Sequence, residues 1–354
     1  MGNNTILTIS IPTYNRAIFL ERSLHSICKQ LNSEIPIIIK VFDNNSTDNT
    51  HEIVKSFMDK YPQISYTKNE RNIGPDLNIG QCYYLSKTKY TWVFGDDDIL
   101  LDGALLYLTN ILNSDIEYGL AFLNYCIFFD NFEIKKQKGN WGKYTYQVDP
   151  ISLVSIVGHR LGFISACIIN TKSISKDEIL INAGTNFNHL YPILNSLKLK
   201  YPNLYIGKYY LAQKGGNSAS LDFFNVFANN LYNIFGETFG EKHKITKFIK
   251  KELLIVILPS AIVCAKKDLN DSNFKSNSFH VLFSNFSPEP LFWIINYPLI
   301  KLPISITVVL NFFYMIISKI YREINIYIFH IHNHSNRCFS ERLVKEDDIF
   351  HCNL

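Results

Sequence analysis

Three consecutive carboxylates follow an apolar run in the stretch YTWVFGDDDIL, residues 90–100. Ionised carboxylates repel one another and are almost never buried without partners, so Asp96, Asp97 and Asp98 require a compensating charge. Hard divalent cations such as Mg²⁺ or Mn²⁺ bind oxygen ligands, usually one or two carboxylates together with substrate phosphates. The cluster therefore indicates a site where a metal ion neutralises a diphosphate leaving group. The alternative is a solvated acidic turn before a helix that Asp102 caps.

Strand and helix patterns alternate over the first hundred residues and must position this cluster. Apolar β-branched runs indicate strands, and apolar residues three or four apart indicate helices. We predict strands at residues 6–11, 35–42, 64–67 and 90–94. This alternation predicts an α/β fold with a mostly parallel sheet, in which ligands bind at the carboxyl ends of the strands. We expect the polar segment after each strand to lie at that edge: PTYNR (12–16), DNNSTDNT (43–50), NERNIGP (69–75) and GDDD (95–98).

The composition and the absence of certain motifs argue against several other classes of protein. The formal net charge is +4 over 354 residues, which argues against nucleic-acid binding by charge alone. The sequence has neither GxGxxG nor GxxxxGK[ST], so dinucleotide and P-loop sites lose their main support. The seven cysteines are scattered without a CxxC pair, which predicts reduced thiols rather than disulfides or a zinc knuckle. The first residues do not follow the signal-peptide pattern, so we expect a cytoplasmic protein.

Four segments together resemble the family 2 glycosyltransferases of the GT-A fold: ISIPTYNR, VFDNNSTDNT, NERNIG and FGDDD, in this order and spacing. The similarity covers about residues 6–112. It implies a Rossmann-like, mostly parallel sheet with helices on both faces, a nucleotide-sugar donor, and Mg²⁺ or Mn²⁺ bound through a DxD motif. The most similar subgroup is the abequosyltransferases and related O-antigen side-branch transferases. These enzymes add a sugar, often a deoxyhexose, to a saccharide on a polyprenyl diphosphate at the cytoplasmic face of the inner membrane.

The resemblance assigns roles to individual positions. It makes Asp96 and Asp98 the DxD carboxylates that bind the metal, with Asp98 the more direct ligand. Asp43 would hydrogen-bond the base or the ribose of the nucleotide. The other residues expected to contact the nucleotide or the sugar are Pro12, Thr13, Tyr14, Arg16, Asn45, Asn72 and Gly74.

The expected catalytic base departs from the family pattern. Many members place an Asp at the start of the acceptor-side helix, whereas the corresponding segment 186–189 here reads Asn-Phe-Asn-His and holds no acid. One hypothesis is that His189 acts as the base, since imidazole titrates near neutrality. A second is that Asp222 supplies the carboxylate. A third is that His189 only hydrogen-bonds the acceptor or a backbone carbonyl.

A change of composition near residue 220 divides the chain into a catalytic domain, residues 1–220, and a helical, membrane-associating region, residues 221–354. Residues 242–251 (KHKITKFIKK) form a basic helical patch. The uncharged stretch 302–318 would span about 26 Å as a helix, less than the ~30 Å hydrocarbon core of a bilayer. Three interpretations remain: a helix in the membrane interface, which a lipid-linked acceptor favours, a helix in the protein core, and a transmembrane span.

Alternating histidines occur near the end of the sequence, at His330, His332 and His334. On one side of a strand they could bind a transition metal, whereas a polar tail is the plainer interpretation.

The whole sequence predicts a hexosyl- or deoxyhexosyltransferase of bacterial O-antigen or surface polysaccharide synthesis. We expect it on the inner face of the cytoplasmic membrane as a peripheral protein. A metal-dependent nucleotidyltransferase is one alternative. A sugar-nucleotide-binding protein that has lost catalysis is the other, and only the missing acid near His189 favours it.

Overall fold

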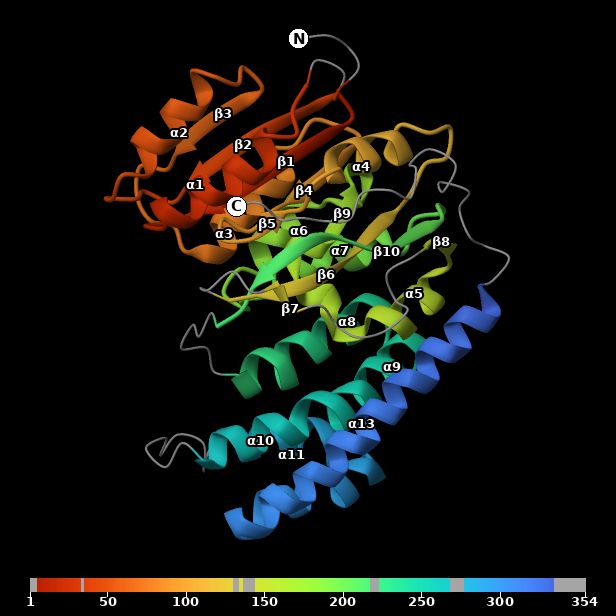
Figure 1. Cartoon of the computed structure of the whole chain (residues 1–354). Helices are drawn as coiled ribbons and strands as arrows, with labels where there is room; N and C mark the ends of the chain where they lie inside the picture. The colour runs from red at the N-terminus through yellow and green to blue at the C-terminus, as the bar shows by residue number, and fades with distance from the viewer. Residues whose placement is uncertain are drawn as a thin grey trace.

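The computed structural model describes residues 5–32, 35–129, 134–135, 144–216, 223–267 and 277–333. Within these ranges a sheet of ten strands fills the N-terminal part of the molecule (Figure 1). Its order is β3-β2-β1-β4-β9-β6-β10-β5, with β7 paired to β6 and β8 paired to β10. The strands are β1 Leu7–Thr13, β2 Ile37–Asp43, β3 Ile64–Lys68, β4 Tyr90–Val93, β5 Ile99–Leu100, β6 Leu120–Phe128, β7 Ile134–Lys135, β8 Thr145–Val148, β9 Cys167–Asn170 and β10 Asn203–Lys214.

The first four strands form the parallel half that the sequence predicts. β1 pairs in parallel with β2 and β4, and β2 pairs in parallel with β3. The side chains of Ile9, Ile39 and Trp92 in these strands are fully buried, because helices cover both faces of a parallel sheet. The connecting helices are α1 Ala17–Cys28, α2 Thr50–Met58 and α3 Pro75–Tyr84. The α/β, GT-A-type prediction is therefore confirmed, with strand boundaries shifted by at most two residues.

The second half of the sheet is mixed. β9 lies between β4 and β6 and runs antiparallel to both. β10 runs parallel to β6 but antiparallel to β5 and β8. Two 3₁₀ turns, Gly158–Gly162 and Ile164–Ala166, precede β9. The helices around this half are α4 Ala104–Leu112, α5 Pro150–Val157, α6 Lys176–Ile181 and α7 Leu190–Ser196.

The C-terminal region is helical, and the boundary predicted at residue 220 falls outside the described residues. Within its described residues, three segments have the wider π-helical turn: Phe224–Leu231, Leu253–Ile257 and Phe292–Asn296. The last helix runs beside α5, α9 and α10 (Figure 1). The α-helices are α8 Tyr232–Phe239, α9 Lys244–Glu252, α10 Leu258–Lys267, α11 Asn277–Phe286, α12 Tyr297–Lys301 and α13 Ile304–His332.

α13 packs through one narrow seam. Thr307 is buried near its start, and Phe329 is buried near its end against the rings of Tyr146 and Tyr205. The helix is long and apolar enough to cross a membrane, and only 6% of its most apolar window is buried. The core-helix interpretation is therefore wrong. The large hydrophobic side chains that α13 exposes are Ile304, Ile306, Val308, Val309, Phe312, Phe313, Met315, Ile316, Ile317, Ile320, Ile324, Tyr327, Ile328 and Ile331.

The histidine repeat also differs from the strand interpretation. His330 and His332 lie in α13, where residues two apart point to different sides of the helix. The Nδ1 atom of His330 lies 3.1 Å from the hydroxyl of Tyr146, and that of His332 lies 2.8 Å from the carbonyl of Ile328. His334 lies outside the described residues. The helical geometry therefore contradicts a metal site made by alternate histidines on one side of a strand.

Candidate active site

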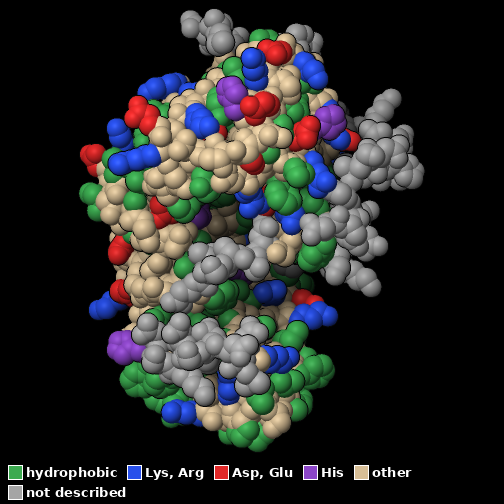
Figure 2. All heavy atoms as spheres, turned by 90° about the vertical axis from the view of Figure 1, so that its left-hand side faces the viewer, with side chains coloured by type: hydrophobic (Ala, Val, Ile, Leu, Met, Phe, Trp, Pro, Cys, Tyr) green, Lys and Arg blue, Asp and Glu red, His purple; other side chains and the backbone are tan. Residues whose placement is uncertain are grey.

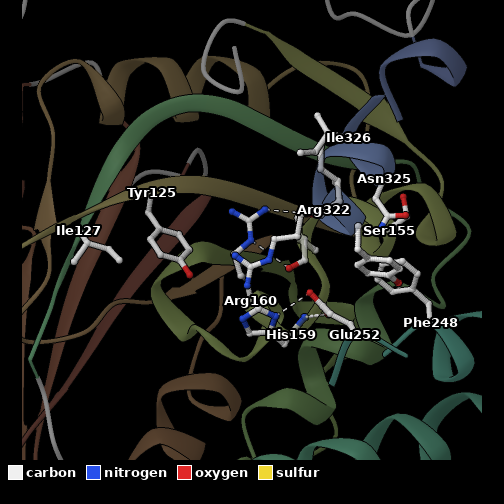
Figure 3. A pocket seen from close by; sticks show the side chains of 13 residues that line it. Tyr125, Ile127, Ser155, His159, Arg160, Phe248, Glu252, Arg322, Asn325 and Ile326 are labelled. Carbon is white, nitrogen blue, oxygen red and sulfur yellow. Dashed lines mark hydrogen bonds and ion pairs between the residues drawn. The ribbon is translucent and has the colours of Figure 1, made fainter. Parts of the chain in front are cut away.

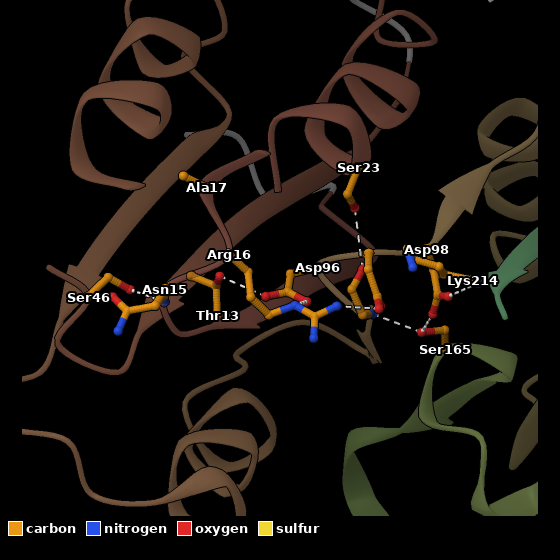
Figure 4. A network of polar contacts seen from close by, with 12 residues as sticks. Thr13, Asn15, Arg16, Ala17, Ser23, Ser46, Asp96, Asp98, Ser165 and Lys214 are labelled. Atoms are coloured by element: carbon orange, nitrogen blue, oxygen red, sulfur yellow. Dashed lines mark hydrogen bonds and ion pairs between the residues drawn. The ribbon is translucent and has the colours of Figure 1, made fainter. Parts of the chain in front are cut away.

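The acidic turn lies between β4 and β5, at the carboxyl end of β4, and Asp96 is almost fully buried there at 7% exposure. One of its carboxylate oxygens accepts a hydrogen bond of 2.8 Å from the Thr13 hydroxyl. The other lies 3.0 Å from Nε of Arg16, and the same guanidinium also pairs with Asp97 (Figure 4). Two residues of the PTYNR segment thus hold two of the three acids, as expected from their shared edge of the sheet.

Asp98 is held by residues from distant parts of the chain and is only 3% exposed. The Ser165 hydroxyl donates to one carboxylate oxygen at 2.6 Å, and the backbone N–H of Lys214 donates to the other at 3.1 Å. Ser165 also accepts from the backbone N–H of Gly95 at 2.8 Å. No sequence motif marks Ser165 or Lys214, because Ser165 reaches the turn through the pairing of β9 with β4 and Lys214 through the pairing of β10 with β5.

Burial raises the pKa of both Asp96 and Asp98 to about 7. The positive charge of Arg16 lowers the pKa of Asp96, and the negative charge of Asp97 raises the pKa values of both. Among the described residues, no three His, Cys, Asp or Glu side chains converge as a complete metal site. Mg²⁺ and Mn²⁺ need only one or two protein carboxylates when phosphates and water supply the other oxygens. Asp96 and Asp98 fit such a cation, because burial makes their ionised forms unfavourable and a bound positive charge would offset that cost.

Asp43 is the last residue of β2 and is fully buried. Its carboxylate accepts a 2.8 Å hydrogen bond from the backbone N–H of Ser46 and a second from the hydroxyl of Tyr66. The Ser46 hydroxyl accepts from the backbone N–H of Asn15 at 2.9 Å. Asp43 therefore fixes the DNNSTDNT loop, and that loop fixes the PTYNR loop.

Asn44 joins this loop to the NERNIGP segment and was missed by the sequence analysis. Its amide donates to Oδ1 of Asn72 at 2.8 Å, while its own Oδ1 accepts from the backbone N–H of Ile73 at 2.9 Å. Asn72 in turn accepts from the backbone N–H of Gly74 at 2.8 Å. Gly74 has φ 85°, a left-handed conformation that favours glycine. The structure thus brings Asn72 and Gly74 to the edge that holds Asp43.

The remaining predicted nucleotide contacts differ in exposure. Tyr14 is 43% exposed, so its ring is available to a ligand. Pro12 is half-buried opposite Phe42 in the neighbouring strand. Asn45 is half-buried with φ 70°, a conformation that Asn adopts more readily than most residues.

His189 directly precedes α7, at the helix start that the sequence predicts. Its Nε2 lies 3.0 Å from the carbonyl oxygen of Gly162, so this nitrogen carries the proton and donates it. Nδ1 is buried and has no hydrogen-bond partner among the described residues. Burial lowers the pKa of His189. The result is a neutral imidazole with an unused lone pair, while the rival base, Asp222, lies outside the described residues.

Asp76 positions the segment before His189. Its carboxylate accepts from the backbone N–H groups of Gly184 at 2.6 Å and Asn186 at 3.0 Å. Its carbonyl oxygen accepts from the Asn188 amide at 2.7 Å. Asp76, the second residue of α3, therefore fixes the approach to His189.

The part of the chain that holds the acidic turn matches one known family. The model of the family "Glycosyl transferase family 2" matches residues 8–167, which include β1 to β4, the acidic turn and Ser165. The chain carries a family 2 glycosyltransferase domain.

Among curated relatives of this glycosyltransferase domain, an abequosyltransferase of Salmonella typhimurium is 37% identical over 117 residues, which cover 33% of this chain and 35% of that protein. The GalNAc(5)-diNAcBac-PP-undecaprenol beta-1,3-glucosyltransferase of Campylobacter jejuni is 30% identical over 138 residues, covering 39% of this chain and 41% of that protein. The matched part thus spans only about two fifths or less of these relatives.

A likeness in fold extends further along the chain. The structure of residues 1–349 of S. aureus TarS, solved with UDP-GlcNAc, covers 90% of this chain and 92% of its own, with a TM-score of 0.61 and 14% identity. At this identity the likeness shows the fold alone. It includes most of the region that follows the glycosyltransferase domain.

Proposed function

We propose that this protein is a metal-dependent glycosyltransferase that moves a sugar from a nucleotide-sugar donor to a saccharide on a polyprenyl diphosphate. The observation that carries the proposal is the buried pair Asp96 and Asp98, whose pKa values burial raises to about 7. The relatives agree with it, since one is named as an abequosyltransferase and another as acting on an undecaprenyl-diphosphate saccharide. The abequosyltransferase supports a role in O-antigen or surface polysaccharide synthesis.

On the donor side, Asp96 and Asp98 would hold the Mg²⁺ or Mn²⁺ ion, which supplies positive charge to the departing nucleotide diphosphate. Asp43 would bind the base or ribose from the loop that it fixes. The exposed ring of Tyr14 would pack against the nucleotide. Arg16 already faces two acids, and its guanidinium would share them with the cation.

On the acceptor side, His189 would take the proton from the attacking hydroxyl. The Gly162 carbonyl holds the tautomer in which Nδ1 carries the free lone pair. Burial lowers the pKa of His189, which keeps this lone pair available at neutral pH. His189 is hydrogen-bonded to Gly162, and Asp98 is hydrogen-bonded to Ser165. Gly162 and Ser165 are three residues apart, a length of chain that spans at most about 10 Å.

At the membrane, α13 would lie in the lipid interface on the cytoplasmic face. Its apolar side chains are exposed along the whole helix, and Figure 2 shows hydrophobic side chains gathered at the lower end of the molecule. α9 adds exposed lysines beside α13, including Lys244, Lys247 and Lys251. Such a pairing of apolar and basic surfaces attracts anionic lipid membranes.

Donor hydrolysis with and without Mn²⁺ tests the proposal. We expect the wild type to hydrolyse a nucleotide sugar slowly and only with the metal, and Asp98→Ala to be inactive although folded. Full activity of Asp98→Ala at limiting metal would remove both carboxylates from the proposed site. Binding of nucleotide sugars without any hydrolysis or transfer would instead favour the sugar-nucleotide-binding alternative.

A further inference from the structure

A cavity of about 240 Å³ lies between the sheet and the C-terminal helices. Its walls come from β6, from the 3₁₀ turn after α5, from the end of α9 and from α13. Figure 3 shows the labelled side chains that enter it, among them Tyr125, Arg160, Glu252 and Arg322. None of these has a role in the function proposed above.

Two guanidinium groups face this cavity without a carboxylate partner. Within the described residues, neither Arg160 nor Arg322 forms an ion pair. Arg160 donates to the Ile156 carbonyl at 2.9 Å and to the Asn124 side chain at 3.1 Å. These neutral acceptors orient its charge but do not cancel it. Arg322 lines the same cavity as Arg160. Burial lowers the pKa of Arg322, the negative charge of Glu252 raises it, and the positive charge of Arg160 lowers it.

Glu252 is the one acid among the described residues that line the cavity, and His159 engages it. The backbone N–H of His159 lies 2.8 Å from one carboxylate oxygen, and its Nδ1 lies 2.9 Å from the other. A side chain at Gly158 would put Cβ 2.1 Å from this carboxylate, so the backbone here is shaped to admit Glu252. With one carboxylate and two guanidiniums, the cavity keeps a surplus of positive charge that suits an anion.

The position of the cavity indicates which anion would bind. Tyr125 lines it from β6, and its ring centroid lies 4.6 Å from that of Phe163. Ser165, two residues after Phe163, donates a hydrogen bond to Asp98. On this side the cavity therefore neighbours the segment that holds the acidic turn. On the other side it is closed by α13, whose outer face exposes apolar side chains.

We propose that this cavity binds the diphosphate group of the lipid-linked acceptor, with Arg160 and Arg322 as its cationic partners. The lipid chain would then leave along α13 and the saccharide would extend past Tyr125 toward Asp98. Arginine is suited to this task because its planar group donates two parallel hydrogen bonds to a phosphate. The inference rests on the proposed function, because it assumes a lipid-linked acceptor.

Binding of geranylgeranyl diphosphate to the full chain in detergent tests this inference. EDTA is present, so that no metal bridges the probe to the acidic turn, and calorimetry gives the dissociation constant. We expect Arg322→Gln to weaken binding by about tenfold to a hundredfold, the usual effect of losing charged hydrogen bonds. Asn325→Asp, which keeps the side-chain size and adds a negative charge to the cavity, should weaken binding to a similar extent.

Lys319→Gln is the matched control. Lys319 lies in the same helix, is exposed, and among the described residues forms its ion pair with Glu323, one turn further along. Its loss removes the same charge without touching the cavity, so binding should be unchanged. Inorganic pyrophosphate should compete with the probe, and geranylgeraniol should bind the wild type and Arg322→Gln equally. Equal weakening by Lys319→Gln and Arg322→Gln, or no weakening by either Arg322→Gln or Asn325→Asp, would overturn the inference.

Two further measurements separate the possible sources of the anion and the two proposals. Vesicles with phosphatidylglycerol should bind Arg322→Gln and Lys319→Gln equally well. Weaker vesicle binding by Arg322→Gln alone would mean that the cavity binds lipid headgroups. Donor hydrolysis with Mn²⁺ should be equal in the wild type and in Arg322→Gln. In the wild type, weak probe binding with normal donor hydrolysis would refute the cavity proposal alone, and absent hydrolysis with normal probe binding would refute the glycosyltransferase mechanism alone.

Discussion

Replacing Asp98 by Asn should stabilise the metal-free protein at alkaline pH while abolishing its activity. Burial raises the pKa of Asp98 from 3.8 to about 7. A tenfold change in proton affinity is worth about 1.4 kcal/mol, so holding the ionised carboxylate in the native state costs about 4 kcal/mol. Asn avoids this cost, but its one carbonyl oxygen replaces only one of the two oxygens that accept from the Ser165 hydroxyl and the Lys214 N–H, a loss of about 1 kcal/mol. The net gain is at most about 3 kcal/mol above pH 7.

The sign of this effect should reverse with pH. Below about pH 4 the carboxyl is protonated in both the folded and unfolded states, so only the lost hydrogen bond counts and Asp98→Asn is less stable than the wild type. Between about pH 4 and 7 the unfolded chain releases a proton that native Asp98 keeps. The stability of the wild type therefore falls as the pH rises through this range, and it is lowest once the folded carboxyl has ionised.

Urea unfolding in EDTA at pH 4, 5, 6, 7 and 8 measures this difference. Asp102→Asn is the control, because Asp102 is exposed and its ion pair with Lys29 lies at the surface, where such pairs contribute about 1 kcal/mol or less at any pH. Mn²⁺ at a hundred times its dissociation constant should then stabilise the wild type by about 2.7 kcal/mol, and Asp98→Asn by less. A difference between Asp98→Asn and the wild type that does not change with pH would refute the reasoning.

Three other changes should have separable effects. His189→Ala should lower the rate of transfer by about 10²–10⁴-fold and leave donor affinity unchanged. It should also remove the acidic limb of the pH–rate profile. That limb should lie below the ordinary histidine pKa, because burial lowers the pKa of His189. A loss under about fivefold would pass the role to Asp222. Phe312→Ser with Phe313→Ser should reduce vesicle binding but not donor hydrolysis, since both rings are exposed; high salt should release the wild type only in part. Gly158→Ala should lower the melting temperature, because its Cβ would meet Glu252 at 2.1 Å, and an unchanged value would contradict that contact.

The parallel half of the fold could be predicted because its signals are local. Each of β1 to β4 is a short apolar run followed by a polar segment, so the pattern of residues identifies both the strand and the edge where Asp43 and Asp96 meet. The alternation does not say what lies beside β4. β9 occupies that place although it follows β4 by more than seventy residues, and its insertion brings Ser165 to Asp98.

The rest of the site depends on contacts that no short pattern contains. Arg160 and Arg322 share a cavity across 162 positions of sequence, and neither belongs to a recognisable motif. The exposure of α13 was equally hidden, because its composition suits a buried helix, an interfacial helix and a membrane span alike. Which face of α13 is buried depends on how the neighbouring helices and strands pack, and they leave most of its apolar side chains exposed.

The packing of Phe329 limits how far the acidic turn can move relative to α13. Its ring lies 5.3 Å from that of Tyr146 and 5.7 Å from that of Tyr205, both in strands of the large sheet. If α13 rests on the bilayer, the sheet cannot swing on a flexible tether, and the distance from the lipid surface to the acidic turn becomes a fixed dimension of the fold. A saccharide too short to bridge that distance would stay out of reach, however well its sugars matched the site. Acceptor length would then be measured by the rigid body of the protein.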